Sequence, residues 1–164
     1  LGHITVLPDG ELCGCGNKGC WETLVSLRAL YRYIQEQFAI DKTSELWQKT
    51  GGNINQLTVE MVITAAQRGD RIAIVALTKV GRYLGIGIAS LINSLNPSIV
   101  VFGGIMSDAW KFLEPVVLAE IKNRALFWNR ENTEIVLAKH GIDACVMGGV
   151  ATIYQATISQ PIAG

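Results

Sequence analysis

The amino-acid sequence predicts an α/β fold, in which helices cover a sheet. Apolar residues make up 49% of the 164 residues and charged residues only 17%, a composition that supports a sizeable core. Two short strand-like runs occur at residues 99–102 and 134–138, and a helical pattern separates them. Because strands that alternate with helices form layered structures, we expect one α/β domain or one lobe of a larger protein.

Residues 1–7 are rich in β-forming residues and lead into a turn at Pro8-Asp9-Gly10. They predict a strand followed by a hairpin or loop. The sequence opens Leu-Gly-His-Ile without a methionine, like a strand entered partway along. We therefore expect this chain to be a fragment of a longer protein.

A buried helix face is predicted over residues 22–38, where apolar side chains recur every three or four positions. These side chains are Leu24, Leu27, Leu30, Tyr31, Ile34 and Phe38. The polar residues 41–57 predict a connection, with one helical turn around Leu46-Trp47.

Capping residues delimit the next two helices. Thr58 predicts the start of a helix that runs to Gln67 and ends at Gly69, and Asp70 predicts the start of another. The second helix is long and continues to Asn96-Pro97. It contains Gly81, Gly85 and Gly87, which indicate tight packing or the close approach of a backbone or ligand.

The second half of the chain predicts a strand-turn-helix core. The apolar run at residues 99–102 is typical of a strand buried on both faces, and Gly103-Gly104 ends it. An apolar stripe predicts a helix over residues 109–127, in which Pro115 is tolerated early. A strand over residues 134–138, a further element over 145–147 and a last helix from Gly148-Gly149 through Tyr154 follow.

Composition also limits the partners of this chain. Fourteen basic and fourteen acidic side chains cancel, so no overall positive field attracts nucleic acid or an anionic membrane. The longest apolar stretch is interrupted by Lys79, Arg82 and Asn93, and no secretory leader opens the sequence. We expect a cytoplasmic protein with no membrane partner.

Three cysteines and a histidine predict a metal site near the start of the chain. Cys13, Cys15 and Cys20 follow His3 in a glycine-rich stretch, and thiols clustered in a reducing compartment bind metal more often than they pair. One imidazole and three thiolates fill the tetrahedral shell of zinc, so we expect a closed, structural site. Gly14, Gly16 and Gly19 would let the loop curl round the ion with positive φ. The isolated Cys145 is predicted to be a small buried hydrophobe.

One part of the sequence resembles the zinc motif of the ROK family, which contains repressors, open reading frames and sugar kinases. This part is Gly2-His3, Pro8-Asp9-Gly10 and Cys13-Gly-Cys15-Gly-Asn-Lys-Gly-Cys20-Trp-Glu22-Thr23. The run from Leu84 to Gly104 resembles the same family's long helix, strand and turn. The resemblance implies the C-terminal lobe of an actin-like ATPase or sugar kinase fold (ribonuclease H-like), with a structural zinc loop. Within it we expect a zinc loop at residues 3–22, a helical segment at 23–95 and a strand-turn-helix core at 98–157.

The resemblance also implies roles for four residues. His3 would be both a metal ligand and a sugar contact, and Glu22 would accept hydrogen bonds from sugar hydroxyls. Taken alone, Glu22 is explained as an acid at a helix N-terminus. In a kinase, Gly103 and Gly104 would lie against the adenosine of ATP, whereas on their own they predict a tight turn. The aspartate base and phosphate loop of the family's kinases are not present in this sequence, so no residue of this chain is expected to be catalytic.

Two functions remain open from the sequence. One is a transcriptional repressor that senses a sugar and binds DNA through an N-terminal domain missing from this sequence; the other is a sugar kinase that uses ATP and Mg²⁺. Three stretches are more similar to xylose- and N-acetylglucosamine-type repressors than to glucokinases: Cys20–Thr23, Thr133–Ala138 and Asp143–Gly149. We therefore expect a repressor of carbohydrate metabolism that forms a homodimer or homotetramer.

Overall fold

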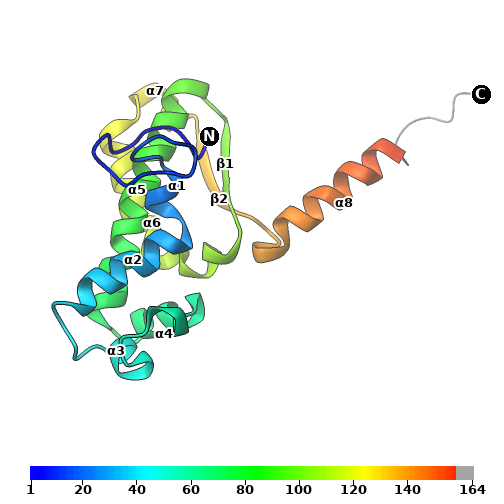
Figure 1. The fold of residues 1–164 in the computed structure, drawn as a ribbon. Helices are drawn as coiled ribbons and strands as arrows, with labels where there is room; N and C mark the ends of the chain where they lie inside the picture. Colours follow the sequence, from blue (N-terminus) through cyan, green and yellow to red (C-terminus); the bar gives the residue numbers. More distant parts are fainter. Residues whose placement is uncertain (158–164) are drawn as a thin grey trace, which may run out of the picture.

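A computed structural model describes residues 1–157, except the side chains of residues 142, 144 and 145 (Figure 1). Residues 1–21 form an irregular loop. The elements that follow are α1 (Glu22–Val25), α2 (Leu27–Phe38), α3 (Glu45–Thr50), the 3-10 helix η1 (Ile54–Gln56), α4 (Val59–Gln67), α5 (Arg71–Leu95), β1 (Ile99–Phe102), the 3-10 helix η2 (Ile105–Ala109), α6 (Trp110–Arg124), α7 (Phe127–Glu131), β2 (Glu134–Leu137), the 3-10 helix η3 (Gly141–Asp143) and α8 (Ala144–Thr157).

The long helix α5 forms the centre of the core, and α1, α2, α4 and α6 pack against it. Its start is fixed by Asp70, whose Oδ1 accepts a hydrogen bond from the Ala73 amide at 3.0 Å. It ends where Asn96 takes a left-handed conformation with φ +44°. Both boundaries were predicted from the sequence and are confirmed. Helix α5 is long and apolar enough to cross a membrane, but 61% of its most apolar window is buried inside the protein, as in a core helix.

The glycines of α5 allow the neighbouring helix to approach closely. A Cβ atom added at Gly85 would lie 2.9 Å from the Val117 carbonyl oxygen, and one added at Gly81 would lie 3.3 Å from the Leu113 carbonyl oxygen. Both carbonyls belong to α6. The tight packing predicted at these glycines is confirmed, and it places the α6 backbone directly against α5.

The single helix predicted over residues 22–38 is divided in two. Ser26 adopts an extended conformation, and its hydroxyl accepts a hydrogen bond from the Ala29 amide at 3.3 Å, which begins α2. A side chain that caps a helix competes with helix continuation, and here the cap prevails. The buried face of α2 also includes Tyr33, which the apolar pattern did not identify.

Strands β1 and β2 are parallel, with Ile99 opposite Glu134 and Phe102 opposite Leu137. The prediction that residues 99–102 are buried on both faces is wrong. Val100 and Phe102 pack against the core, whereas Ile99 is 49% exposed and Val101 is 57% exposed. In the described part of the chain the sheet has two strands, and core side chains cover one of its faces.

Three other predicted elements differ from the structure. Residues 1–7 form a single antiparallel bridge, between Thr5 and Cys20, and no continuous strand, because the amides of Val6 and Leu7 both donate to the same Gly19 carbonyl. The helix predicted over 109–127 ends at Arg124, and α7 follows it. The last helix begins at residue 144, and α8 projects away from the other elements (Figure 1). The prediction for the Cys145 side chain lies outside the described residues.

Candidate metal centre

The N-terminal loop is closed by hydrogen bonds between its own backbone groups. The Gly10 amide donates to the Leu7 carbonyl at 2.8 Å, which confirms the predicted turn, and the Gly19 amide donates to the Glu11 carbonyl at 2.8 Å. Gly19 has φ +62°, and an added Cβ would lie 1.5 Å from the Leu7 carbonyl oxygen. Only glycine fits at this crossing. Gly16 also has a positive φ, whereas Gly14 does not, contrary to the sequence prediction.

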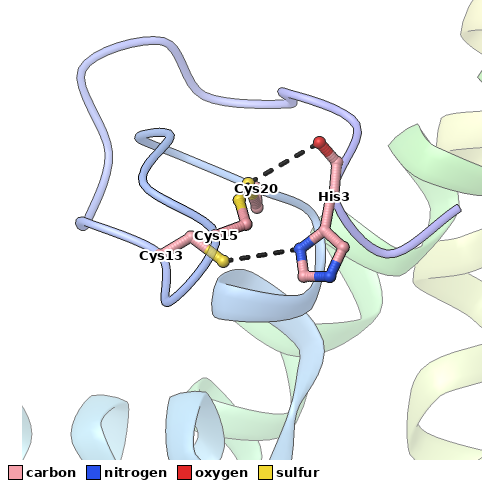
Figure 2. A group of neighbouring side chains, drawn as sticks. All are labelled: His3, Cys13, Cys15 and Cys20. Carbon is pink, nitrogen blue, oxygen red and sulfur yellow. Dashed lines mark hydrogen bonds between the residues drawn. The ribbon is translucent and has the colours of Figure 1, made fainter.

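The loop brings together His3, Cys13, Cys15 and Cys20 (Figure 2). Their ligand atoms all lie within 4.8 Å of one another. The Cys13 Sγ is 3.5 Å from the His3 Nδ1, and the Cys15 Sγ is 3.5 Å from the Cys20 Sγ. Sulfurs bound to one tetrahedral zinc ion would be separated by about 3.8 Å. The donor types and spacings therefore fit a metal ion such as zinc.

The four side chains differ in burial. Cys20 is completely buried and Cys13 is 7% exposed, whereas His3 and Cys15 are exposed at the surface of the loop. The Asn17 amide donates a hydrogen bond to the Cys15 sulfur, which lowers the pKa of that thiol. Burial raises the pKa of the Cys20 thiol to about 12. Because a coordinated thiol loses its proton, a bound divalent cation would reverse the effect at Cys20.

Glu22 lies in the same cavity as the cluster. The cavity has a volume of about 280 Å³, and its walls include His3, Cys13, Cys15 and Glu22. Glu22 is the first residue of α1, and a Cβ built at Gly2 would lie 3.5 Å from its Oε2. The carboxylate is exposed and has no ion pair or hydrogen-bond partner among residues 1–157. Helix α1 has only four residues and therefore a weak dipole, so the carboxylate remains an available acceptor.

Two residues that sequence reasoning missed attach the loop to the core. The Trp21 indole lies over Gly87 of α5, and its Nε1 donates to the Tyr83 carbonyl at 2.9 Å. Arg32 of α2 pairs with Glu11 of the loop at 3.1 Å and donates to the Thr23 carbonyl at 3.0 Å. Gly87 indicated a close neighbour, but the sequence could not identify that neighbour as Trp21.

Gly103 and Gly104 lie apart from the cluster of His3 and the three cysteines, on a separate apolar cavity of about 360 Å³. Phe102 and Met106 line it on the β1 side, and Leu27 lines it on the α2 side. Gly104 has φ +90°, which explains a glycine at that turn without a ligand. Ser26 lines both cavities, so they lie on either side of the α1–α2 junction.

Comparison with known sequences relates the chain to both regulators and enzymes. The model of the ROK family matches residues 1–156. A glucokinase from Halalkalibacterium halodurans is 36% identical over 91% of this chain and 45% of its own length. The xylose repressor of Caldicellulosiruptor bescii is 29% identical over 98% of this chain and 40% of its own length. The DNA-binding transcriptional dual regulator NagC of Escherichia coli is 35% identical over 83% of this chain and 32% of its own length.

The solved structures similar to this chain also include both kinases and transcriptional regulators. A ROK family glucokinase from Streptomyces griseus, in complex with glucose and AMPPNP, matches with a TM-score of 0.81 and 29% identity, over 92% of this chain and 49% of that one. A ROK family transcriptional regulator, homologous to the E. coli MLC protein, matches with a TM-score of 0.73 and 31% identity, over 84% of this chain and 33% of that one. The chain therefore has the α/β fold, of the actin-like ATPase type, that these kinases and regulators share, and it spans less than half of their length.

The contact between Trp21 and Gly87 gives a test of how the loop is attached. In a Gly87→Ala variant the new Cβ would lie 2.0 Å from the Trp21 ring, so the indole must move and lose its hydrogen bond to Tyr83. We expect a loss of about 1–3 kcal/mol in the free energy of unfolding, measured by urea titration. The matched control is Gly148→Ala in α8, where an added Cβ meets no atom within 4 Å and stability should not fall. Equal stability of the two variants would show that the indole does not hold the loop.

Proposed function

The chain belongs to the ROK family, and on that basis we propose that it is the sugar-binding C-terminal lobe of a transcriptional repressor of carbohydrate metabolism. The observation that carries the proposal is the Glu22 carboxylate, which has no partner among residues 1–157 and shares a cavity with His3, Cys13 and Cys15 of the cluster. A carboxylate next to a rigid loop is a preorganised acceptor for sugar hydroxyls, because little entropy is lost when the ligand binds.

The ion that we assign to the cluster is zinc, in a structural role. His3 and the three cysteines would fill its four positions and leave none for water. The ion therefore holds the loop and takes no part in chemistry. This assignment is supported by the donor set and by the short distances between the donors.

The sugar contacts that we assign are Glu22 and His3. The His3 Nδ1 faces the Cys13 sulfur, as Figure 2 shows, so the Nε2 atom remains free to donate a hydrogen bond to a ligand. Glu22 would accept hydrogen bonds from neighbouring hydroxyls. The ion then fixes the orientation of the imidazole, as metals commonly do for their histidine ligands.

The repressor role is supported by two relatives. The C. bescii xylose repressor aligns with 98% of this chain, and the E. coli regulator NagC is 35% identical over 83% of it. We assign DNA binding to an N-terminal domain outside these 164 residues, because the chain carries no net charge and spans only 40% of the xylose repressor. In the cytoplasm, bound sugar would change the angle between two lobes and the spacing of DNA-reading helices in a dimer or tetramer.

The alternative function is a sugar kinase, and the apolar cavity at Gly103 and Gly104 favours it. Its mostly apolar walls suit a flat aromatic base such as the adenine of ATP. ATP and Mg²⁺ would then be required, and the catalytic base would come from outside this chain. The same cavity is also explained by the meeting of α2 with the end of β1, so the repressor remains our proposal.

Removal of the metal should destabilise the protein. If zinc holds the loop, a strong chelator should lower the midpoint of thermal unfolding by about 6–12 °C, for a loss of about 3 kcal/mol. The measurement is differential scanning calorimetry with and without the chelator, together with metal analysis, which should find one zinc per chain. An unchanged midpoint after complete removal of zinc would rule out a structural role.

Glu22→Gln tests the sugar contact. Loss of a charge-assisted hydrogen bond should weaken sugar binding about ten- to a hundredfold, as measured by calorimetric titration of full-length protein. The control is Glu114→Gln, since Glu114 is exposed on α6 and does not line this cavity. Unchanged affinity in Glu22→Gln would remove this residue from the site.

The choice between repressor and kinase is tested on full-length protein with glucose, xylose and N-acetylglucosamine. We expect the protein to bind DNA from upstream of its own gene, and one of these sugars to change that affinity, as followed by fluorescence anisotropy. We also expect no sugar-dependent consumption of ATP. Turnover of ATP with any of the three sugars at about 1 s⁻¹ or faster would instead establish a kinase.

A further inference from the structure

A second cavity adjoins the cavity of the metal loop. It has a volume of about 620 Å³, compared with about 280 Å³ for the first. Three residues line both cavities: Glu11, Arg28 and Arg32. The second cavity also has Tyr31, Gln35 and Asn55 in its walls. A ligand bound beside Glu22 could therefore extend into the second cavity past this shared wall.

One face of α2 forms the wall that connects the two cavities. Arg28, Tyr31, Arg32 and Gln35 follow the spacing i, i+3, i+4 and i+7, which places them on one side of the helix. Leu30 and Ile34 lie on the core face of the same helix, and Tyr31 is half-buried at its edge, packed against the core as well as lining the cavity. Asn55 comes from η1, next to α3 and α4 in the chain. The stripe on α2 therefore runs from the metal loop towards η1.

Several side chains along this wall have hydrogen-bonding groups that no described residue uses. Within residues 1–157, Arg28 is the one arginine without an ion pair. The Tyr31 hydroxyl and the side-chain amides of Gln35 and Asn55 likewise have no protein partner there. Arg32 differs, because Glu11 and the Thr23 carbonyl hold it in place. Arg32 is thus held in place where the two cavities meet, and the available donors and acceptors of Tyr31, Gln35 and Asn55 line the second cavity.

The chemistry of this wall suits a second sugar ring. A pyranose has apolar C–H faces that pack on an aromatic ring such as Tyr31, and hydroxyl edges that pair with amides and guanidinium groups. Gln35 and Asn55 are neutral and can both donate and accept, as hydroxyl groups require. We propose that the second cavity is a sugar subsite, so that the ligand of this protein is a disaccharide or longer glycoside. This inference rests on the proposed sugar site at Glu22.

The test compares sugars and variants by calorimetric titration of zinc-loaded, full-length protein. The probes are glucose, xylose and N-acetylglucosamine, each paired with its β-1,4 disaccharide: cellobiose, xylobiose and N,N′-diacetylchitobiose. We expect at least one disaccharide to bind about tenfold more tightly than its monosaccharide. Tyr31→Ala and Asn55→Ala should each weaken disaccharide binding about three- to tenfold, from the loss of one or two contacts. Monosaccharide affinity should stay within twofold, which also shows that the variants fold.

Gln35→Ala and Gln37→Ala form a matched pair on α2, because Gln35 lines the second cavity and Gln37 lines neither cavity. Only Gln35→Ala should weaken disaccharide binding. Monosaccharide binding with no preference for a disaccharide would overturn the subsite and leave the first site intact. A preference for glucose 6-phosphate that Arg28→Ala abolishes would also overturn it, since the wall would then recognise an anion. If none of the sugars binds, the sugar site at Glu22 and the subsite both fail.

Discussion

The positions of His3 and of the adjoining Glu22 depend on how residues 1–21 are held, because this segment contains no helix or extended strand. A few backbone hydrogen bonds close it, at a crossing where Gly19 admits no side chain. The remaining constraint is the cluster of His3 and three cysteines, whose ligand atoms lie within 4.8 Å of one another. A segment of this kind would lose much conformational entropy on folding, and a metal ion bound to the four side chains would offset that cost.

Two contacts attach the loop to the helices, one from Trp21 at its end and one from Glu11 near its middle. Trp21 rests on Gly87 of the central helix α5, and Arg32 ties α2 to Glu11 of the loop. Glu22 directly follows Trp21, so the contact between Trp21 and α5 holds the backbone that carries this carboxylate. Because α5 also packs against α6, which approaches Gly81 and Gly85, the candidate site is built on the most buried part of the molecule.

Features determined by local chemistry were predictable from the sequence. The caps at Thr58 and Asp70 and the cysteine spacing are examples, because each depends on residues close together in the chain. Features that depend on residues far apart in the chain could not be predicted from the sequence. Ile99 and Val101 read as buried but face away from the core, and residues 1–7 pair with their own loop rather than a strand. Arg28, Arg32 and Gln35 of α2 were not identified as a site, because the helical pattern specifies only apolar positions, among which it placed Tyr31.

The central claim is that the metal loop frames the sugar site. The direct measurement is calorimetric titration of one sugar into full-length protein, first loaded with zinc and then stripped of it under conditions where circular dichroism shows that the helices persist. If the loop positions His3 and Glu22, affinity should fall at least about tenfold without zinc and return when zinc is restored. Equal affinity in the two forms would contradict the claim, and the metal would then stabilise the loop without shaping the site.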